Sequence, residues 1–151
     1  MQRQTTDSAG AYNTLLIIWF ALLVSQFLFL VLIYVIRPEV LSFDFSKPLL
    51  NGNAVLIIVV AAAAATDLML SFVMRKRYLD RAVAEHNVGM VATALIVGCA
   101  LCESVSLFGL LLAFAFEYPY FWLLSALGIF GTILHFPQKS SVEAAAFRPQ
   151  V

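Results

Sequence analysis

A single carboxylate, Glu103, lies inside the otherwise apolar or weakly polar run CALCESVSLFGLLLAF, residues 99–114. A carboxyl group holds a proton in dry surroundings and releases it when the surroundings become polar or a cation approaches. The hydroxyl groups of Ser104 and Ser106 follow on the same segment and offer further oxygen ligands. We therefore predict an ion-binding site formed by Glu103, Ser104 and Ser106.

Three further polar residues in apolar segments, Asp67, Thr93 and Gln26, form a possible ion path to this site. We expect Asp67 to face water, or Thr93 across a helical hairpin, and to lie about 10 Å nearer the cytoplasmic side than Glu103, too far for a direct pair. Gln26 and its neighbour Ser25 are placed to hydrogen-bond with Glu103. The alternative for each of these residues is packing or adhesion between helices.

Other chemically active residue types do not form a recognisable site. Cys99 and Cys102 make a C-x-x-C pair on one continuous helix without a further Cys or a following His, so we interpret them as buried thiols. His86 and His135 fall near predicted segment ends, where we expect them to anchor at the interface. No nucleotide-binding, triad or metalloprotease motif is present, which indicates at most a membrane subunit of a larger ion-translocating enzyme, without metal or cofactor.

The composition determines where this chemistry takes place. Hydrophobic residues make up 62% of the 151 residues and charged residues 12%, with a mean hydropathy of +0.93. Such a chain is too apolar for an ordinary soluble domain and predicts an integral membrane protein whose main partner is the lipid bilayer. The formal net charge is zero, so no basic surface for nucleic acid is expected.

Four apolar segments are predicted as membrane-spanning helices, at residues 12–36, 54–74, 88–116 and 121–136. They are too long and too uniformly apolar for strands of a barrel. The predicted fold is an all-α, four-helix transmembrane domain over residues 1–137, followed by a mobile polar tail at residues 138–151. The basic segment 75–81 is expected to form the loop between the second and third helices.

The distribution of Lys and Arg predicts the orientation. With the N-terminus inside, the inner segments hold seven basic residues and the outer ones hold two, Arg37 and Lys47. Cytoplasmic segments carry the excess of Lys and Arg, so both termini are predicted to be cytoplasmic. The first apolar segment is too long for a signal peptide. A bacterial inner membrane is the favoured location.

Small residues recur along the third segment at intervals of three or four. They are Ala94, Gly98, Cys102, Ser106, Gly109 and Ala113, and we call them the small-residue stripe. Such a stripe lies on one helix face and allows a second helix to approach closely. The alanine run at residues 61–65 offers a matching surface, so we predict that the stripe packs against the second helix.

Residues 54–116 resemble the rotor-ring proteolipid, subunit c, of rotary ATP synthases. The resemblance rests on GCALCES at residues 98–104 and FGLLLAF at residues 108–114, which are similar to that family's carboxylate-bearing helix. It implies that Glu103 is the ion-binding carboxylate, that segment 75–81 is the polar cytoplasmic loop, and that the chain forms a homo-oligomer. The chain departs from the family in having alanines in place of the first helix's glycine repeat, and in carrying the carboxylate on the third of four helices.

The identity of the ion is predicted from the residues opposite the carboxylate. Sodium-binding members of that family add a glutamine on the partner helix. Reflecting the hairpin about its basic loop sets Glu103 opposite residues 55–59, which are all apolar. A proton is therefore favoured over sodium.

Two hypotheses of function follow. The first is a proteolipid-like membrane subunit in which Glu103 exchanges a proton during proton translocation or proton-coupled work. The second is a non-transporting structural or assembly subunit of a larger membrane complex. In the second, the small-residue stripe is the docking face, and a neutral Glu103 supplies one hydrogen bond.

Overall fold

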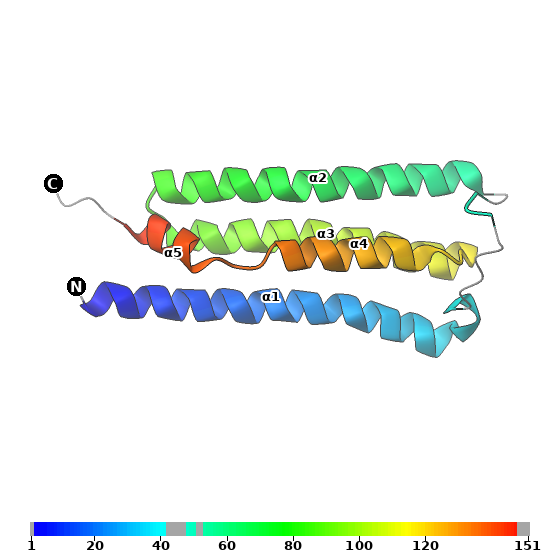
Figure 1. Ribbon diagram of the computed structural model, residues 1–151, viewed down its shortest axis with the longest axis horizontal. Coiled ribbons are helices and arrows are strands. Elements are labelled where there is room, and N and C mark those ends of the chain that lie inside the picture. Colours follow the sequence, from blue (N-terminus) through cyan, green and yellow to red (C-terminus); the bar gives the residue numbers. More distant parts are fainter. Residues whose placement is uncertain (1, 42–47, 51–52, 148–151) are drawn as a thin grey trace.

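The computed structural model describes residues 2–41, 48–50 and 53–147, and all regular structure within these ranges is helical. The elements are α1 (Gln2–Ile36), the 3-10 helix η1 (Pro38–Leu41), α2 (Ala54–Ala84), α3 (Val88–Phe116), α4 (Phe121–Leu134) and α5 (Lys139–Ala146). Helices α1 to α4 run alongside one another in alternating directions, and α5 lies at the same end as the start of α1 (Figure 1). The predicted all-α class is confirmed.

Within the described residues, three helical stretches are long and apolar enough to cross a membrane: Ala9–Ile36 within α1, α2 and α3. Helix α4 has 14 residues, or about 21 Å, which is shorter than a hydrocarbon core of about 30 Å. It is followed by α5 at a bend of 48°, and a fourth crossing is counted only when this bent pair is taken as one span. Helix length and composition thus define an integral membrane protein with three or four candidate crossings.

Several predicted helix ends are wrong. Helix α2 continues through the basic segment to Ala84 instead of stopping at residue 74, because Arg, Lys and Leu are good helix formers and nothing in that segment breaks a helix. The turn comes at His86, which has a φ of 50°, and Asn87 caps α3 by accepting a 3.0 Å hydrogen bond from the Gly89 N–H. Helix α1 begins at Gln2, ahead of the predicted residue 12, and α4 ends at Leu134.

The expected mobile tail contains a packed helix, which corrects the prediction for residues 138–151 over the part that is described. Helix α5 buries Val142 and Ala145 fully, and it contacts α1, α2 and α3. A polar helix with a narrow apolar face is ordered by this burial. The segment therefore covers one end of the molecule.

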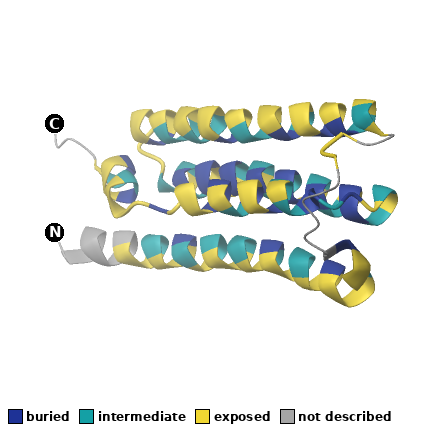
Figure 2. Ribbon diagram, turned by 45° about the vertical axis from the view of Figure 1, so that its right-hand side comes forward, coloured by how far each residue is buried: buried dark blue, intermediate teal, exposed yellow. Residues whose placement is uncertain are grey.

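The interior is organised around α3, which contacts α1, α2, α4 and α5. Buried residues are concentrated on the central helices, whereas the outer sides of α1 and α2 are exposed (Figure 2). Those outer sides carry large apolar side chains such as Ile17 (71% exposed), Val55 (79%) and Met69 (72%). Exposed apolar surfaces of this kind suit contact with lipid.

Two apolar clusters occupy the two ends of the molecule, and polar residues lie between them. One cluster includes Ile33, Leu112 and Phe121, and the other includes Leu15 and Val91. The buried polar residues between them are Gln26, Ser71, Ser106, Ser125 and Thr132, all at most 2% exposed. The middle of the interior is therefore held by hydrogen bonds.

The small-residue stripe packs closely against α4, which was not predicted, and it also meets the predicted partner α2, where Cys102 Sγ lies 3.6 Å from the Ser71 hydroxyl oxygen. A Cβ added to Gly128 would lie 2.6 Å from the Cys102 carbonyl oxygen, and one added to Gly109 would lie 2.8 Å from the Phe121 carbonyl oxygen. Both helices thus use glycine to bring their backbones together. Helices α2 and α3 still form a hairpin, but within the alanine run 61–65 only Ala64 is fully buried.

Candidate functional site

The three residues of the predicted ion-binding site contact different helices. Glu103 lies 2.6 Å from the hydroxyl of Ser25 on α1, and Ser104 lies 2.6 Å from Asp67 on α2. Ser106 donates a 2.9 Å hydrogen bond to Gln26 on α1. Because these polar groups diverge around α3, the structure does not bring Glu103, Ser104 and Ser106 together as one set of ligands.

The hairpin register also differs from the prediction. Because α2 extends to Ala84, residue 104 of α3 meets Asp67 of α2, and residues 55–59 lie closer to the opposite end of the hairpin. Asp67 and Glu103 are therefore at similar depth, and the predicted 10 Å offset is wrong. Asp67 also does not bond with Thr93, whose hydroxyl donates to the Gly89 carbonyl at 3.3 Å on an exposed surface.

The predicted hydrogen bond to Glu103 is made by Ser25, and Gln26 makes others. The Ser25 hydroxyl oxygen lies 2.6 Å from Glu103 Oε1 and 2.8 Å from the Leu22 carbonyl oxygen in its own helix. A hydroxyl group has one proton, so it donates to only one of these acceptors at a time. Both contacts are hydrogen bonds at once when Glu103 carries a proton and donates it to Ser25.

The contact between Asp67 and Ser104 repeats this geometry. The Ser104 hydroxyl oxygen lies 2.6 Å from Asp67 Oδ2 and 2.7 Å from the Leu101 carbonyl oxygen, three residues back in α3. Both acids are half-buried. Each acid is thus paired with a serine whose single proton has two alternative acceptors.

These two pairs flank a face of α3 that none of the other described helices covers. The exposed positions of α3 recur at helical spacing and include Thr93, Ile96, Ala100, Leu107 and Leu111. Helices α1 and α2 lie on opposite sides of α3 (Figure 1), and α4 covers its small-residue stripe. We call these five residues the uncovered face.

A buried network joins α1, α3 and α4 on the other side of α3. Gln26 is fully buried, donates to Thr132 Oγ1 at 2.5 Å and accepts from Ser106 at 2.9 Å. The indole N–H of Trp19 donates to the Thr132 carbonyl at 2.8 Å. All four partners are neutral, and hydrogen bonds of this kind hold membrane helices together. For Gln26, the structure therefore favours adhesion.

His135 is a buried residue that was wrongly predicted to be an interfacial anchor. It is fully buried, its Nδ1 lies 2.7 Å from the Gly131 carbonyl oxygen, and its Nε2 has no hydrogen-bond partner within the described ranges. A Cβ on Gly98 would lie 2.8 Å from Nε2, so the ring rests on the backbone of α3. Sequence reasoning missed this contact because it paired the stripe with α2.

Arg75 ties α2 to the end of α4. Its guanidinium group donates to the carbonyl oxygens of Leu134 at 3.1 Å and Phe136 at 2.9 Å. Terminal helix carbonyls lack partners in their own helix, and a basic side chain satisfies them. Arg75 is half-buried in α2, whereas a loop was predicted at this position.

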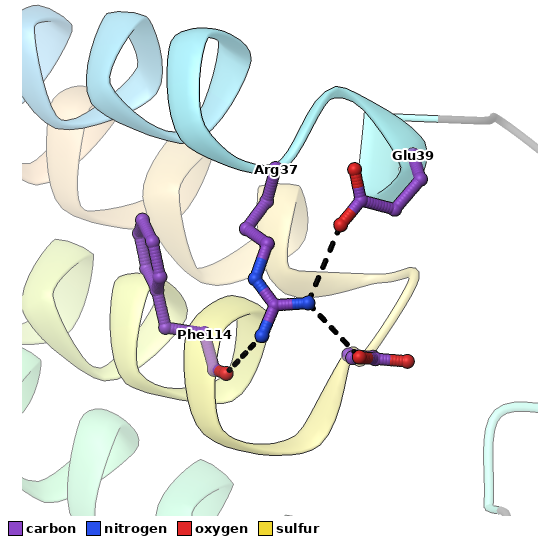
Figure 3. A network of polar contacts seen from close by, with 4 residues as sticks. Arg37, Glu39 and Phe114 are labelled. Atoms are coloured by element: carbon purple, nitrogen blue, oxygen red, sulfur yellow. Dashed lines mark hydrogen bonds and ion pairs between the residues drawn. The ribbon is translucent and has the colours of Figure 1, made fainter.

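A second arginine organises the opposite end of the molecule. Arg37 follows α1 and donates to Glu117 at 3.0 Å, to Glu39 at 3.3 Å and to the Phe114 carbonyl at 3.5 Å (Figure 3). These carboxylates raise the pKa of Arg37, with Glu117 the larger cause. Glu117 ends α3 in the left-handed conformation, with a φ of 48°. The cluster joins the end of α1 to the end of α3.

These features define the class of protein as a polytopic α-helical membrane protein with two half-buried carboxylic acids in its apolar helices. Comparison of the chain with protein-family models, with curated proteins and with solved structures gives no match.

Proposed function

We propose that this protein is a proton-exchanging membrane subunit in which Glu103 binds and releases the proton. The observation that carries the proposal is the position of the Ser25 hydroxyl between Glu103 Oε1, at 2.6 Å, and the Leu22 carbonyl, at 2.8 Å. When Glu103 is protonated, it donates to Ser25, and Ser25 donates to Leu22. When Glu103 is ionised, the Ser25 hydroxyl turns and donates to the carboxylate.

The serine thus supports both states of the acid without moving a helix. Only a hydroxyl rotation is needed, and hydroxyl rotors adapt freely to their partners. An isolated charge inside a membrane helix costs about 2.5 to 3.5 kcal/mol on insertion scales, so a donor that reaches the ionised form lowers this cost. A proton remains favoured over sodium, because among the described residues the side chain bonded to Glu103 is the single hydroxyl of Ser25 and not a cage of oxygens.

The experiment is proton uptake by the full chain reconstituted in vesicles, followed with a pH-sensitive dye. Glu103→Gln should abolish proton movement because the amide cannot release a proton at neutral pH. Ser25→Ala should slow it by about ten- to 150-fold, since a hydrogen bond to a charged group contributes roughly 1.5 to 3 kcal/mol. Glu117→Gln, at an exposed end, is the matched control. Unchanged flux in Glu103→Gln would overturn the proposal.

The second candidate is a structural or assembly subunit, and the uncovered face of α3 favours it. The small-residue stripe is occupied by α4, so a partner would dock on the uncovered face instead. Ala100→Phe should then release the partner, while Ala62→Phe, an equally bulky change at another exposed site, should not. Native mass of the complex in mild detergent distinguishes a homo-oligomer, a mixed complex and a monomer.

The proposed setting is a bacterial inner membrane with both termini in the cytoplasm. Arg75, Lys76, Arg77 and Arg81 belong to the last turns of α2, at the end of the molecule where α1 starts and where α5 lies. The excess of basic residues at that end supports this orientation. A cysteine-accessibility assay with a label that does not cross membranes tests it: Cys at position 139 should react only from the cytoplasmic side.

A further inference from the structure

We infer that Asp67 is a second proton-binding carboxyl of this protein, equivalent to Glu103 and supported by Ser104. The inference extends the proposed function, because it assigns the same chemistry to a different helix. It rests on a geometry that occurs twice among the described residues. In each case a serine oxygen lies 2.6 Å from a carboxylate oxygen on a neighbouring helix.

Each of these two serines also lies close to the backbone carbonyl oxygen of the residue three positions earlier in its own helix. For Ser104 it is Leu101 O at 2.7 Å, and for Ser25 it is Leu22 O at 2.8 Å. The single serine proton serves one of these two acceptors at a time. Both contacts are hydrogen bonds at once when the acid carries a proton, with Asp67 O–H donating to Ser104 and Ser104 donating to Leu101.

The described stretches of α2 and α3 around Asp67 carry no cationic side chain. Residues 54–74 of α2 and 88–116 of α3 contain no Lys, Arg or His, and the basic residues of α2 begin at Arg75, two turns further on. Arg75 itself is bonded to carbonyls at the end of α4. Intramembrane acids without a cationic partner are expected to be neutral.

The position of the two acids gives the pair a common access route. Glu103 and Ser104 are consecutive in α3 and diverge to its two sides, toward α1 and toward α2. The uncovered face lies between them, and both acids are half-buried instead of enclosed. A membrane-soluble reagent therefore reaches both carboxyls from the lipid.

The test is labelling of the full chain in vesicles with dicyclohexylcarbodiimide, read by mass spectrometry. The reagent needs a protonated carboxyl: the O–H adds across one C=N bond, and the acyl group then migrates to nitrogen without loss of any atom. The native chain should carry two labels, at Asp67 and Glu103. Asp67→Asn and Glu103→Gln should each carry one, and the double variant none.

A spectroscopic measurement makes the result independent of reagent access. Infrared spectra at neutral pH should contain carbonyl stretches of two protonated carboxyls, one lost in Asp67→Asn and the other in Glu103→Gln. Ser104→Ala should shift only the Asp67 band, and Ser25→Ala only the Glu103 band. Glu117→Gln should change neither.

Several results would overturn the inference. They are the absence of a band that depends on Asp67, a single label at Glu103, and a Ser104→Ala variant with an unshifted spectrum. Each is separable from failure of the proposed function, because that function is judged by proton flux in Glu103→Gln. If proton flux is unchanged in Glu103→Gln but Asp67 is found protonated, the proposed function fails and the inference about Asp67 stands.

Discussion

Ser104 of α3 and Asp67 of α2 are joined by a 2.6 Å contact between the hydroxyl and the carboxyl oxygen. The contact fixes how α2 and α3 are aligned along their axes, because it pairs one residue of each helix at the same depth. It also brings Asp67 level with Glu103, the neighbour of Ser104 in sequence. The alignment of α2 against α3 therefore places both acids at the same depth in the protein.

This register predicts which cysteine pairs form a disulfide. In a background with Cys99→Ala and Cys102→Ala, cysteines at positions 67 and 104 should cross-link on mild oxidation, since the side chains at these two positions are in contact across the interface. Cysteines at positions 59 and 103, which a loop at residues 75–81 would bring together, should stay reduced. Peptide mapping by mass spectrometry distinguishes the two outcomes, and the reverse pattern would refute the register.

Gly98 is predicted to be intolerant of any side chain. Gly98→Ala sets a Cβ against the buried ring of His135, and overpacking of this kind typically costs 1 to 3 kcal/mol. Gly10→Ala is the matched control, because no atom lies within 4 Å of its added Cβ and alanine favours a helix. Unfolding in mixed micelles should be easier for the first variant and unchanged or harder for the second.

The hydrogen bonds of Gln26 should contribute measurably to helix association. Gln26→Leu leaves Thr132 and Ser106 without one partner each, and an unsatisfied buried group costs roughly 1 to 3 kcal/mol. Removing the partner as well, in Gln26→Leu with Thr132→Val, should be less damaging than the sum of the two single variants. Additive effects in this double-mutant cycle would show that the residues act independently.

The Arg37 cluster is predicted to protect the far end of the molecule. Arg37→Met removes the donor to Glu117, Glu39 and the Phe114 carbonyl, so amide exchange around residues 37–41 and 114–118 should become faster. Glu39→Gln should have a smaller effect, since its contact with Arg37 is the longer of the two ion pairs. Hydrogen exchange by mass spectrometry measures both. Because surface ion pairs are screened, high salt should reduce the difference.

The sequence was sufficient for the helical class and for the bounds of α3, since a run of 29 mostly apolar residues allows few alternatives. The end of α2 was not predictable from charge alone. Arg, Lys and Leu favour a helix as strongly as the apolar residues before them, and a change from lipid to water leaves the backbone intact. The error of about ten residues at this end moved every predicted contact across the hairpin.

The polar residues of the site were predictable from the sequence, but the contacts between them were not. Glu103 and Asp67 stand out because acids are rare in apolar helices, and Ser25 was found as a partner of Glu103. The direction in which Ser104 and Ser106 face depends on which helix covers which side of α3. That assignment depends on α4, whose glycines Gly128 and Gly131 match the stripe only once the two helices are paired.

The bonds from Arg75 to the Leu134 and Phe136 carbonyls have a consequence for the synthesis of the chain. Helix α4 has 14 residues, too few to span the bilayer unaided, and its last carbonyls depend on a side chain made about sixty residues earlier. The ribosome therefore delivers the hairpin of α2 and α3 before the helix that needs it. We therefore expect α4 to join the bundle by docking onto α2 and α3, and not by partitioning into lipid on its own.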